Sequence, residues 1–269
     1  MNKIIYYYQT FTGLDYLEQN NYKNVTHINL SSIHFGKNNN GSNYIHLNND
    51  DPYSKNFDKL WEQITNASKY CKIYLMVGGA GTAYQQLFSD FENYYKLLHD
   101  LIKNKSCITG IDLDIEEAVQ LENIQMLIRR IKQDFGENFE ISMAPVASSL
   151  TSDTPGMGGF IYKDLYNSDE GKMINHFNVQ AYYDYSFNTF DSIVKNGYSK
   201  DQIVMGMISS QDVNNNINEI EKIIAKYDSF GGVFNWEYFD SPPGAPSRPD
   251  VWSEIMNYLL KYKKYSNDI

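Results

Sequence analysis

The chain has 269 residues, of which 42% are hydrophobic, and this is enough to build one large buried core. Its formal net charge of -10 and its sequence pI of about 4.9 argue against a nucleic-acid surface or an anionic membrane as partner. A neutral or cationic ligand suits this charge better.

Residues 1–8 form a short apolar segment that predicts a first strand. The segment is too short for a secretory signal and lacks a small-residue cleavage site. No apolar run is long enough to cross a bilayer, so we expect a protein that acts inside a cell or is packaged, unless a leader was removed. Cys71 and Cys107 each precede an apolar run, which predicts buried thiols rather than a disulfide or a metal site.

Eight apolar or β-branched runs predict strands, and segments of helix length lie between them. The predicted strands span residues 3–8, 25–30, 72–77, 108–115, 139–144, 176–182, 202–208 and 231–236. The predicted helices span residues 57–70, 84–104, 121–131, 213–227 and 251–263.

This alternation of strands and helices calls for a parallel sheet covered by helices. Eight such units close most readily into a (β/α)8 barrel, the TIM barrel, whose usual size the chain matches. No linker or shift in composition divides the chain, so we expect residues 1–269 to form a single α/β domain. The Asn-rich residues 37–49 and the Gly-rich residues 151–159 are predicted to be longer loops.

Three carboxylates, Asp112, Asp114 and Glu116, alternate with aliphatic residues in and just after the predicted strand 108–115. The two-residue spacing places all three on one face of a strand. On the wet face of an antiparallel sheet such a row would simply be solvated. In a barrel the row instead rises toward the mouth, where active sites are built. Like charges at this spacing raise the pKa of one carboxyl group, which can then act as a general acid.

Residues 109–116, Thr-Gly-Ile-Asp-Leu-Asp-Ile-Glu, resemble the Asp-Gly-x-Asp-x-Asp-x-Glu signature of the family 18 glycoside hydrolases, which include chitinases and endo-β-N-acetylglucosaminidases. The match fails only at the first position. Other strand ends are similar to those of the family, in the same order: Gly78-Gly79, Met143-Ala144-Pro145, Gln180-x-Tyr182 and Trp236. The resemblance covers the whole chain and implies a catalytic barrel.

The resemblance also implies catalytic roles for four residues. Glu116 looks like the acid that protonates the leaving glycosidic oxygen. Asp114 looks like the group that orients the N-acetyl group of the sugar and stabilises its developing positive charge, with Asp112 deeper and tuning Asp114. Tyr182 would hydrogen-bond the acetamido oxygen, which is the nucleophile in this family.

For substrate binding, Trp236 would form a floor on which the apolar face of a sugar lies. The further candidates for substrate binding are Gln180, Tyr183, Asp184, Met143, Gly79 and Tyr7. Tyr183 stays open as an alternative to Tyr182, because Asp184 comes one position later than the acidic or amide residue of the family. Thr109 and Met76 stand where the family has Asp and Ser, and we expect both to lie in the inner support of the acid row.

The resemblance implies an endo-acting glycoside hydrolase that cleaves β-1,4 linkages next to N-acetylglucosamine, in chitin or chitooligosaccharides, by substrate-assisted retaining catalysis. Residues 209–230 suffice for one helix between the last two strands, so the α+β insertion of many family members is absent and the cleft should be open and shallow.

Three alternatives stay open on the sequence alone. They are an endo-β-N-acetylglucosaminidase that acts on N-glycans, a catalytically weak, lectin-like relative that binds chitin or glycans, and an enzyme that uses the acid row as ligands for a divalent metal. We expect a monomer with no cofactor, no metal, and no nucleic-acid or membrane partner.

Overall fold

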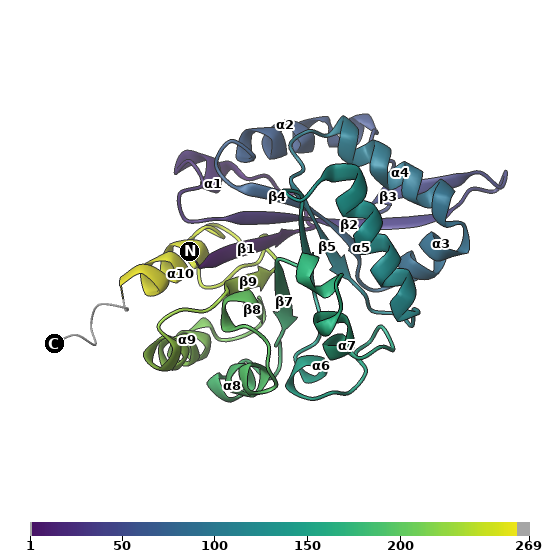
Figure 1. Cartoon of the computed structure of the whole chain (residues 1–269). Helices are drawn as coiled ribbons and strands as arrows, with labels where there is room; N and C mark the ends of the chain where they lie inside the picture. Colours follow the sequence, from purple (N-terminus) through teal and green to yellow (C-terminus); the bar gives the residue numbers. More distant parts are fainter. Residues whose placement is uncertain (1, 263–269) are drawn as a thin grey trace.

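The computed structural model describes residues 2–262 of the chain. Eight parallel strands form a closed barrel with helices around it (Figure 1). The barrel closes because β1 (Lys3–Tyr8) pairs both with β2 (His27–Lys37) and with the last strand, β9 (Gly232–Trp236). The structure therefore confirms the (β/α)8 TIM barrel that the sequence predicts.

All eight predicted strands and all five predicted helices have counterparts in the structure; residue 263, the predicted end of the last helix, lies outside the described residues. The remaining strands are β3 (Asn43–Leu47), β4 (Lys72–Gly78), β5 (Gly110–Asp114), β6 (Glu140–Met143), β7 (His176–Gln180) and β8 (Ile203–Ile208). The helices are α1 (Asp15–Gln19), α2 (Asp58–Ala67), α3 (Ala83–Ser89), α4 (Phe91–Asn104), α5 (Leu121–Phe135), α6 (Ser148–Thr151), α7 (Tyr162–Asn167), α8 (Phe187–Lys195), α9 (Val213–Tyr227) and α10 (Val251–Tyr262). Short 3-10 turns span Lys55–Phe57, Gly171–Met173 and Lys200–Gln202.

Strand residues alternate between two buried layers, because successive side chains point to opposite faces of the barrel wall. The larger layer lies between the strands and the helices and includes the predicted apolar face of α5. A smaller cluster fills the barrel interior near its mouth and consists of Ile5, Tyr7, Met76, Val204 and Phe234. Both cysteines are free and buried in the outer layer, as predicted. A single helix, α9, lies between β8 and β9.

The sequence prediction of a loop over residues 37–49 is wrong in part. The strand β2 runs seven residues further than predicted, to Lys37, and pairs antiparallel with β3. The reason is that Phe35, Ile45 and Leu47 alternate with polar residues and are buried against the helices, which stabilises a two-stranded extension of the barrel wall.

Two further differences concern helices. The predicted helix 84–104 is interrupted at Asp90, whose backbone is extended (φ -154°, ψ 63°), so that α3 and α4 pack separately. Helix α8 was not predicted, although Ser186 caps its amino end by accepting a hydrogen bond from the Thr189 N–H. Among residues 2–262, no helix is both long and apolar enough to span a bilayer.

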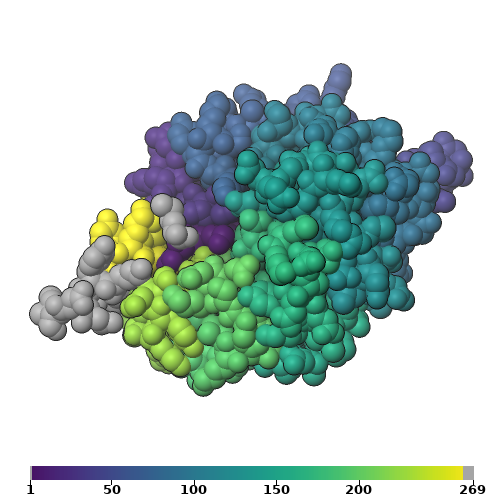
Figure 2. All heavy atoms as spheres, viewed as in Figure 1, coloured from purple at the N-terminus to yellow at the C-terminus, as the bar shows by residue number. Residues whose placement is uncertain are grey.

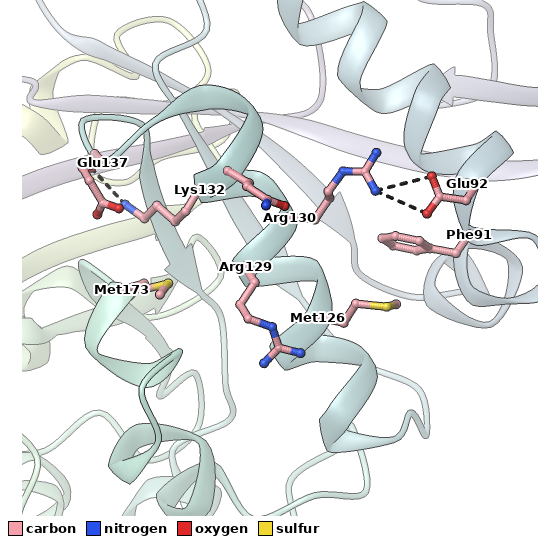
Figure 3. A pocket seen from close by; sticks show the side chains of 9 residues that line it. Phe91, Glu92, Met126, Arg129, Arg130, Lys132, Glu137 and Met173 are labelled. Carbon is pink, nitrogen blue, oxygen red and sulfur yellow. Dashed lines mark hydrogen bonds and ion pairs between the residues drawn. The ribbon is translucent and has the colours of Figure 1, made fainter.

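A hollow of about 510 Å³ lies on the flank of the barrel, lined by residues of α4 and α5 and by Met173 (Figure 3). Its cationic side chains already have partners within the protein. Arg129 pairs with Glu170, Arg130 binds Glu92 and Asp134, and Lys132 donates to the carbonyl oxygen of Glu137. These contacts link α5 to α4 and to the segment around Glu170, which gives the hollow a structural role.

The base of the barrel contains a buried polar cluster formed by His27, Tyr74, Glu140 and His176. The rings of His27 and Tyr74 lie 5.0 Å apart, and His176 lies 5.6 Å from His27. Tyr74 and Lys72 both hydrogen-bond the Glu140 carboxylate. Burial lowers the pKa of His176 well below its usual value, and the positive charge of Lys3 adds to this effect.

This cluster makes stability depend on pH. Because His176 is neutral when folded but takes up a proton when unfolded below pH 6.5, the free energy of unfolding falls as the pH is lowered from 7 to 5. We predict that His176→Phe, which keeps a ring but cannot titrate, reduces this loss by about 2 kcal/mol. Urea unfolding at both pH values measures it; equal pH dependence in the variant and the original protein would contradict the prediction.

Candidate active site

The three carboxylates of β5 and its end occupy the inner face and rim of the barrel. Asp112 is fully buried, Asp114 is 5% exposed, and Glu116, two residues beyond the end of the strand, is partly exposed. The aliphatic residues between them lie in the outer layer against the helices. The row therefore faces inward and rises to the mouth, as predicted from its two-residue spacing.

Asp112 is held by donors from three other strands. Its Oδ2 accepts a hydrogen bond from the Tyr7 hydroxyl (2.6 Å), and its Oδ1 accepts from the Ser142 hydroxyl (2.6 Å) and the Asn178 amide (3.0 Å). Burial raises the pKa of Asp112, and the three donors oppose this rise because they favour the ionised form. Asp112 is thus the fixed, deeply placed member of the row.

Asp114 lies nearer the mouth than Asp112, and its carboxyl group accepts fewer hydrogen bonds. The Gln180 amide nitrogen donates to Asp114 Oδ1 (3.0 Å), to Glu116 Oε1 (3.4 Å) and to the Ala144 carbonyl oxygen (2.8 Å). Burial raises the pKa of Asp114 well above its usual value, and the charges of Glu116 and Asp112 raise it further. Its environment therefore favours the protonated form of Asp114, in the direction expected for one member of a row of like charges.

Gly78 and Gly79 let the end of β4 approach Asp114 closely. A side chain at Gly78 would place its Cβ 2.1 Å from the Asp114 carbonyl oxygen, and one at Gly79 would lie 3.7 Å from the Asp114 carboxyl. Both residues have positive φ angles, which glycine adopts without strain. The Gly79 N–H donates to the Asp114 carbonyl oxygen (3.0 Å), so the paired glycines shape one side of the site.

An aromatic wall stands on the opposite side of the mouth. Trp236 is partly exposed at the end of β9, with its ring 5.3 Å from Tyr7, and Tyr182 packs 6.2 Å from Phe234. Burial raises the pKa of Tyr182 well above its usual value, and the charges of Asp114 and Glu116 add to this, so its hydroxyl stays a donor. Tyr183 is 92% exposed. Of the two tyrosines, the structure brings Tyr182 to the carboxylates.

Met143, a candidate for substrate binding, does not face the site. It is fully buried in the outer layer between strands and helices. The register explains this correction: β6 pairs Ser142 with Asp112 and Met143 with Leu113, so Ser142 points inward and Met143 outward. The methionine is a core residue.

The structure does not place Thr109 beside the acid row, where the sequence predicts it. Thr109 is exposed at the base of the barrel, where its hydroxyl hydrogen-bonds the backbone of Ile73. It lines a hollow of about 920 Å³; Figure 2 shows the amino-terminal atoms in a recess beside α10. Met76 is buried inside the barrel beside Asp112, as expected. Asp184 is exposed in the loop after Tyr182.

Sequence reasoning missed three residues that organise the site: Ser142, Asn178 and Glu237. The first two could have been found, because each is a polar residue between two apolar residues of its strand and must therefore point to the opposite face. Glu237 follows Trp236 and accepts hydrogen bonds from the backbone N–H groups of Gln9 (2.7 Å) and Thr10 (2.8 Å). It ties the end of β9 to the end of β1, and nothing in the sequence points to that contact.

Within residues 2–262, no three side chains of His, Cys, Asp or Glu are grouped as metal ligands. The buried carboxylates of the row are instead bonded to hydroxyl and amide donors. Chemically, the site presents a buried carboxyl group with a raised pKa, a second carboxyl group at the rim and a phenol, all beside an aromatic surface. This arrangement can transfer a proton to a bound neutral molecule and stabilise positive charge.

Comparisons with solved structures give close matches, although no sequence profile of a protein family and no curated protein sequence matches the chain. A fungal endo-β-N-acetylglucosaminidase from glycosyl hydrolase family 18 is 31% identical, covers 97% of this chain and 99% of its own, and superposes with a TM-score of 0.86. The chitinase ChiC from Aspergillus fumigatus is 29% identical over 95% of this chain and 98% of its own (TM-score 0.83).

The catalytic domain of a family 18 chitinase from the fern Peteris ryukyuensis shares the fold, with 16% identity, a TM-score of 0.70, and coverage of 96% of this chain and 99% of its own. The barrel, the inward acid row and the similarity to the fungal enzyme over nearly the whole length agree with the resemblance seen in residues 109–116. The chain belongs to glycosyl hydrolase family 18.

Proposed function

We propose that the protein is an endo-acting glycoside hydrolase that cleaves β-1,4 linkages next to N-acetylglucosamine, with retention and with help from the substrate's own acetamido group. The observation that carries this proposal is the buried Asp114 carboxyl, which lies between Asp112 and Glu116 on the inner face of the barrel and shares the Gln180 amide with Glu116. Such a row supplies both a proton and a partner for an acetamido group.

In the first step, Glu116 gives a proton to the glycosidic oxygen while the bond from C1 of the sugar to that oxygen breaks. The acetamido oxygen of the same sugar attacks C1, so that positive charge develops on the ring it closes. We propose that Asp114 and Glu116 share the proton held in the row, which allows Glu116 to arrive as an acid. Asp114 then carries negative charge next to the acetamido N–H and stabilises it.

In the second step, water attacks C1 while the bond between C1 and the acetamido oxygen breaks, which restores the neutral acetamido group. Glu116 takes up the water proton, which restores the acid and gives the retained product. Tyr182 supports both steps, since its hydroxyl can donate to the acetamido oxygen as that oxygen attacks. Trp236 forms the floor under the reacting sugar, held in place by the contact between its neighbour Glu237 and the end of β1.

The substrate we favour is chitin or chitooligosaccharides, since the similar protein ChiC is named a chitinase. A second candidate, the N-linked glycans of glycoproteins, is favoured by the 31% identity to an endo-β-N-acetylglucosaminidase. The single helix between β8 and β9 adds no further domain beside the mouth, which supports an open cleft and internal cleavage of longer chains. A non-catalytic lectin is disfavoured because all three carboxylates of the row are present.

We predict that Glu116→Gln lowers kcat on a fluorogenic chitobiose glycoside about 10²–10⁴-fold, because the amide cannot protonate the leaving oxygen. Glu122→Gln, an exposed carboxylate at the start of α5, is the matched control and should keep normal activity. Product analysis on chitooligosaccharides and on a high-mannose glycopeptide then identifies the substrate. A Glu116→Gln enzyme as active as the control would refute the assignment of the acid.

We predict that Tyr182→Phe lowers kcat about 100-fold, since one donor to the acetamido oxygen is lost in the transition state. Tyr183→Phe should change kcat less than twofold, because this ring is 92% exposed. Steady-state kinetics of both variants on the same glycoside test this. The reverse order of effects would mean that the exposed tyrosine turns into the site when substrate binds.

A further inference from the structure

The hollow of about 920 Å³ lies at the base of the barrel, at the opposite end from the acid row (Figure 2). It is lined chiefly by residues 21–26, by residues 68–72 and by the α10 residues Asn257, Leu260 and Lys261, and we call it the basal hollow. Its volume lies within the range of about 300–1,000 Å³ that small-molecule sites occupy. Because the active site of a barrel lies at the mouth, the basal hollow has no part in the reaction proposed above.

The floor of the basal hollow is apolar, and its walls are bonded to one another. Ile4 is 4% exposed and Leu260 is 8% exposed, so both are almost covered by the protein. The Ile4 N–H donates to the Thr26 hydroxyl (2.8 Å), which joins β1 to the segment before β2. The Asn257 amide donates to the Asn24 side-chain oxygen (2.7 Å), which holds α10 against the same segment. The hollow is therefore a fixed part of the fold.

Positive charge surrounds this floor. The charged residues that line the hollow, within the described part of the chain, are all lysines: Lys23, Lys69, Lys72 and Lys261. Lys72 pairs with Glu140, whereas Lys69 bonds only the neutral amide of Asn66. Within residues 2–262, Lys23 and Lys261 form no ion pair with a carboxylate. In a chain whose net charge is -10, such a local excess of positive charge attracts an anion.

A pair of tyrosine rings forms one wall of the basal hollow. Tyr22 and Tyr70 are stacked, with ring centroids 5.8 Å apart and planes at 20°. Tyr22 is 1% exposed, but Tyr70 is 56% exposed, so the outer ring still offers surface to a ligand. Asn21 and Tyr22 have φ angles of 55° and 54°, which residues other than glycine rarely adopt, so the fold keeps Tyr22 behind Tyr70 at a conformational cost. A flat ring can stack on such a surface.

We propose that the basal hollow is a binding site for a nucleotide, a small ligand with two or more phosphate groups and a flat ring. The phosphate groups pair with Lys23, Lys69 and Lys261, since lysine is a common partner of phosphate in proteins. The base stacks on Tyr70. The site lies at the far end of the barrel from the carboxylates, so this inference is independent of the glycan that the enzyme cleaves.

Calorimetric titration of ATP, tripolyphosphate and adenosine into the full chain, without divalent cations, tests the inference. ATP should bind more tightly than the other two, because it alone meets both the lysines and the tyrosine. Lys23→Gln and Lys261→Gln should each weaken ATP binding about tenfold. Tyr70→Ala should weaken ATP binding about fivefold and leave tripolyphosphate binding unchanged. Lys59→Gln, which removes an exposed lysine of α2 outside the hollow, is the matched control and should bind ATP normally.

Three results would overturn the inference: no measurable binding of ATP, ATP binding that the lysine variants weaken no more than the control does, or equal binding of ATP and tripolyphosphate that Tyr70→Ala leaves unchanged. A second measurement locates the ligand. ATP should raise the Tm of the original protein more than that of Lys23→Gln, because it binds only the folded chain. It should leave hydrolysis of the chitobiose glycoside unchanged. Competition between ATP and the glycoside would place ATP at the acid row and would also overturn the inference.

Discussion

The hydrogen bonds that hold the buried Asp112 carboxyl connect four strands of the barrel at a single point. Tyr7 comes from β1, Ser142 from β6 and Asn178 from β7, while Asp112 itself lies on β5. A carboxyl group without solvent is costly unless donors surround it, and each hydrogen bond to a charged group stabilises by about 1.5–3 kcal/mol. The site can therefore form only when the barrel has closed in this register.

The environment of Asp114 follows from that arrangement. Because Asp112 takes the three donors of the interior, Asp114 has one amide and is left between two other carboxyl groups. The close approach of Gly78 and Gly79 excludes side chains that could otherwise serve it. The same geometry that surrounds one carboxyl group with donors leaves the next one with a strongly raised pKa, and a carboxylic acid at the mouth is what glycoside cleavage requires.

The barrel and the acid row could be predicted from the sequence because their patterns are local: apolar runs of strand length, and carboxylates at every second position. Tyr7, Gln180 and Gly79, which the sequence offers as candidates for substrate binding, lie next to the row. The sequence prediction for Met143 is wrong because the direction of its side chain depends on the register between β5 and β6. The prediction for Thr109 is wrong because the signature does not reveal that its first residue lies at the base of the barrel. The hairpin β2–β3 and the Glu237 contact arise from pairing between distant segments, which no local pattern encodes.

The central claim, that the fold raises the pKa of Asp114 well above its ordinary value, can be measured directly by carbon-13 NMR of protein labelled at its aspartate carboxyl carbons. The account predicts one resonance, absent from Asp114→Asn, that titrates at a clearly higher pH than an ordinary aspartate. A spectrum in which the Asp114 carboxyl is already ionised at pH 7 and titrates near its ordinary pKa of about 3.9 would contradict it.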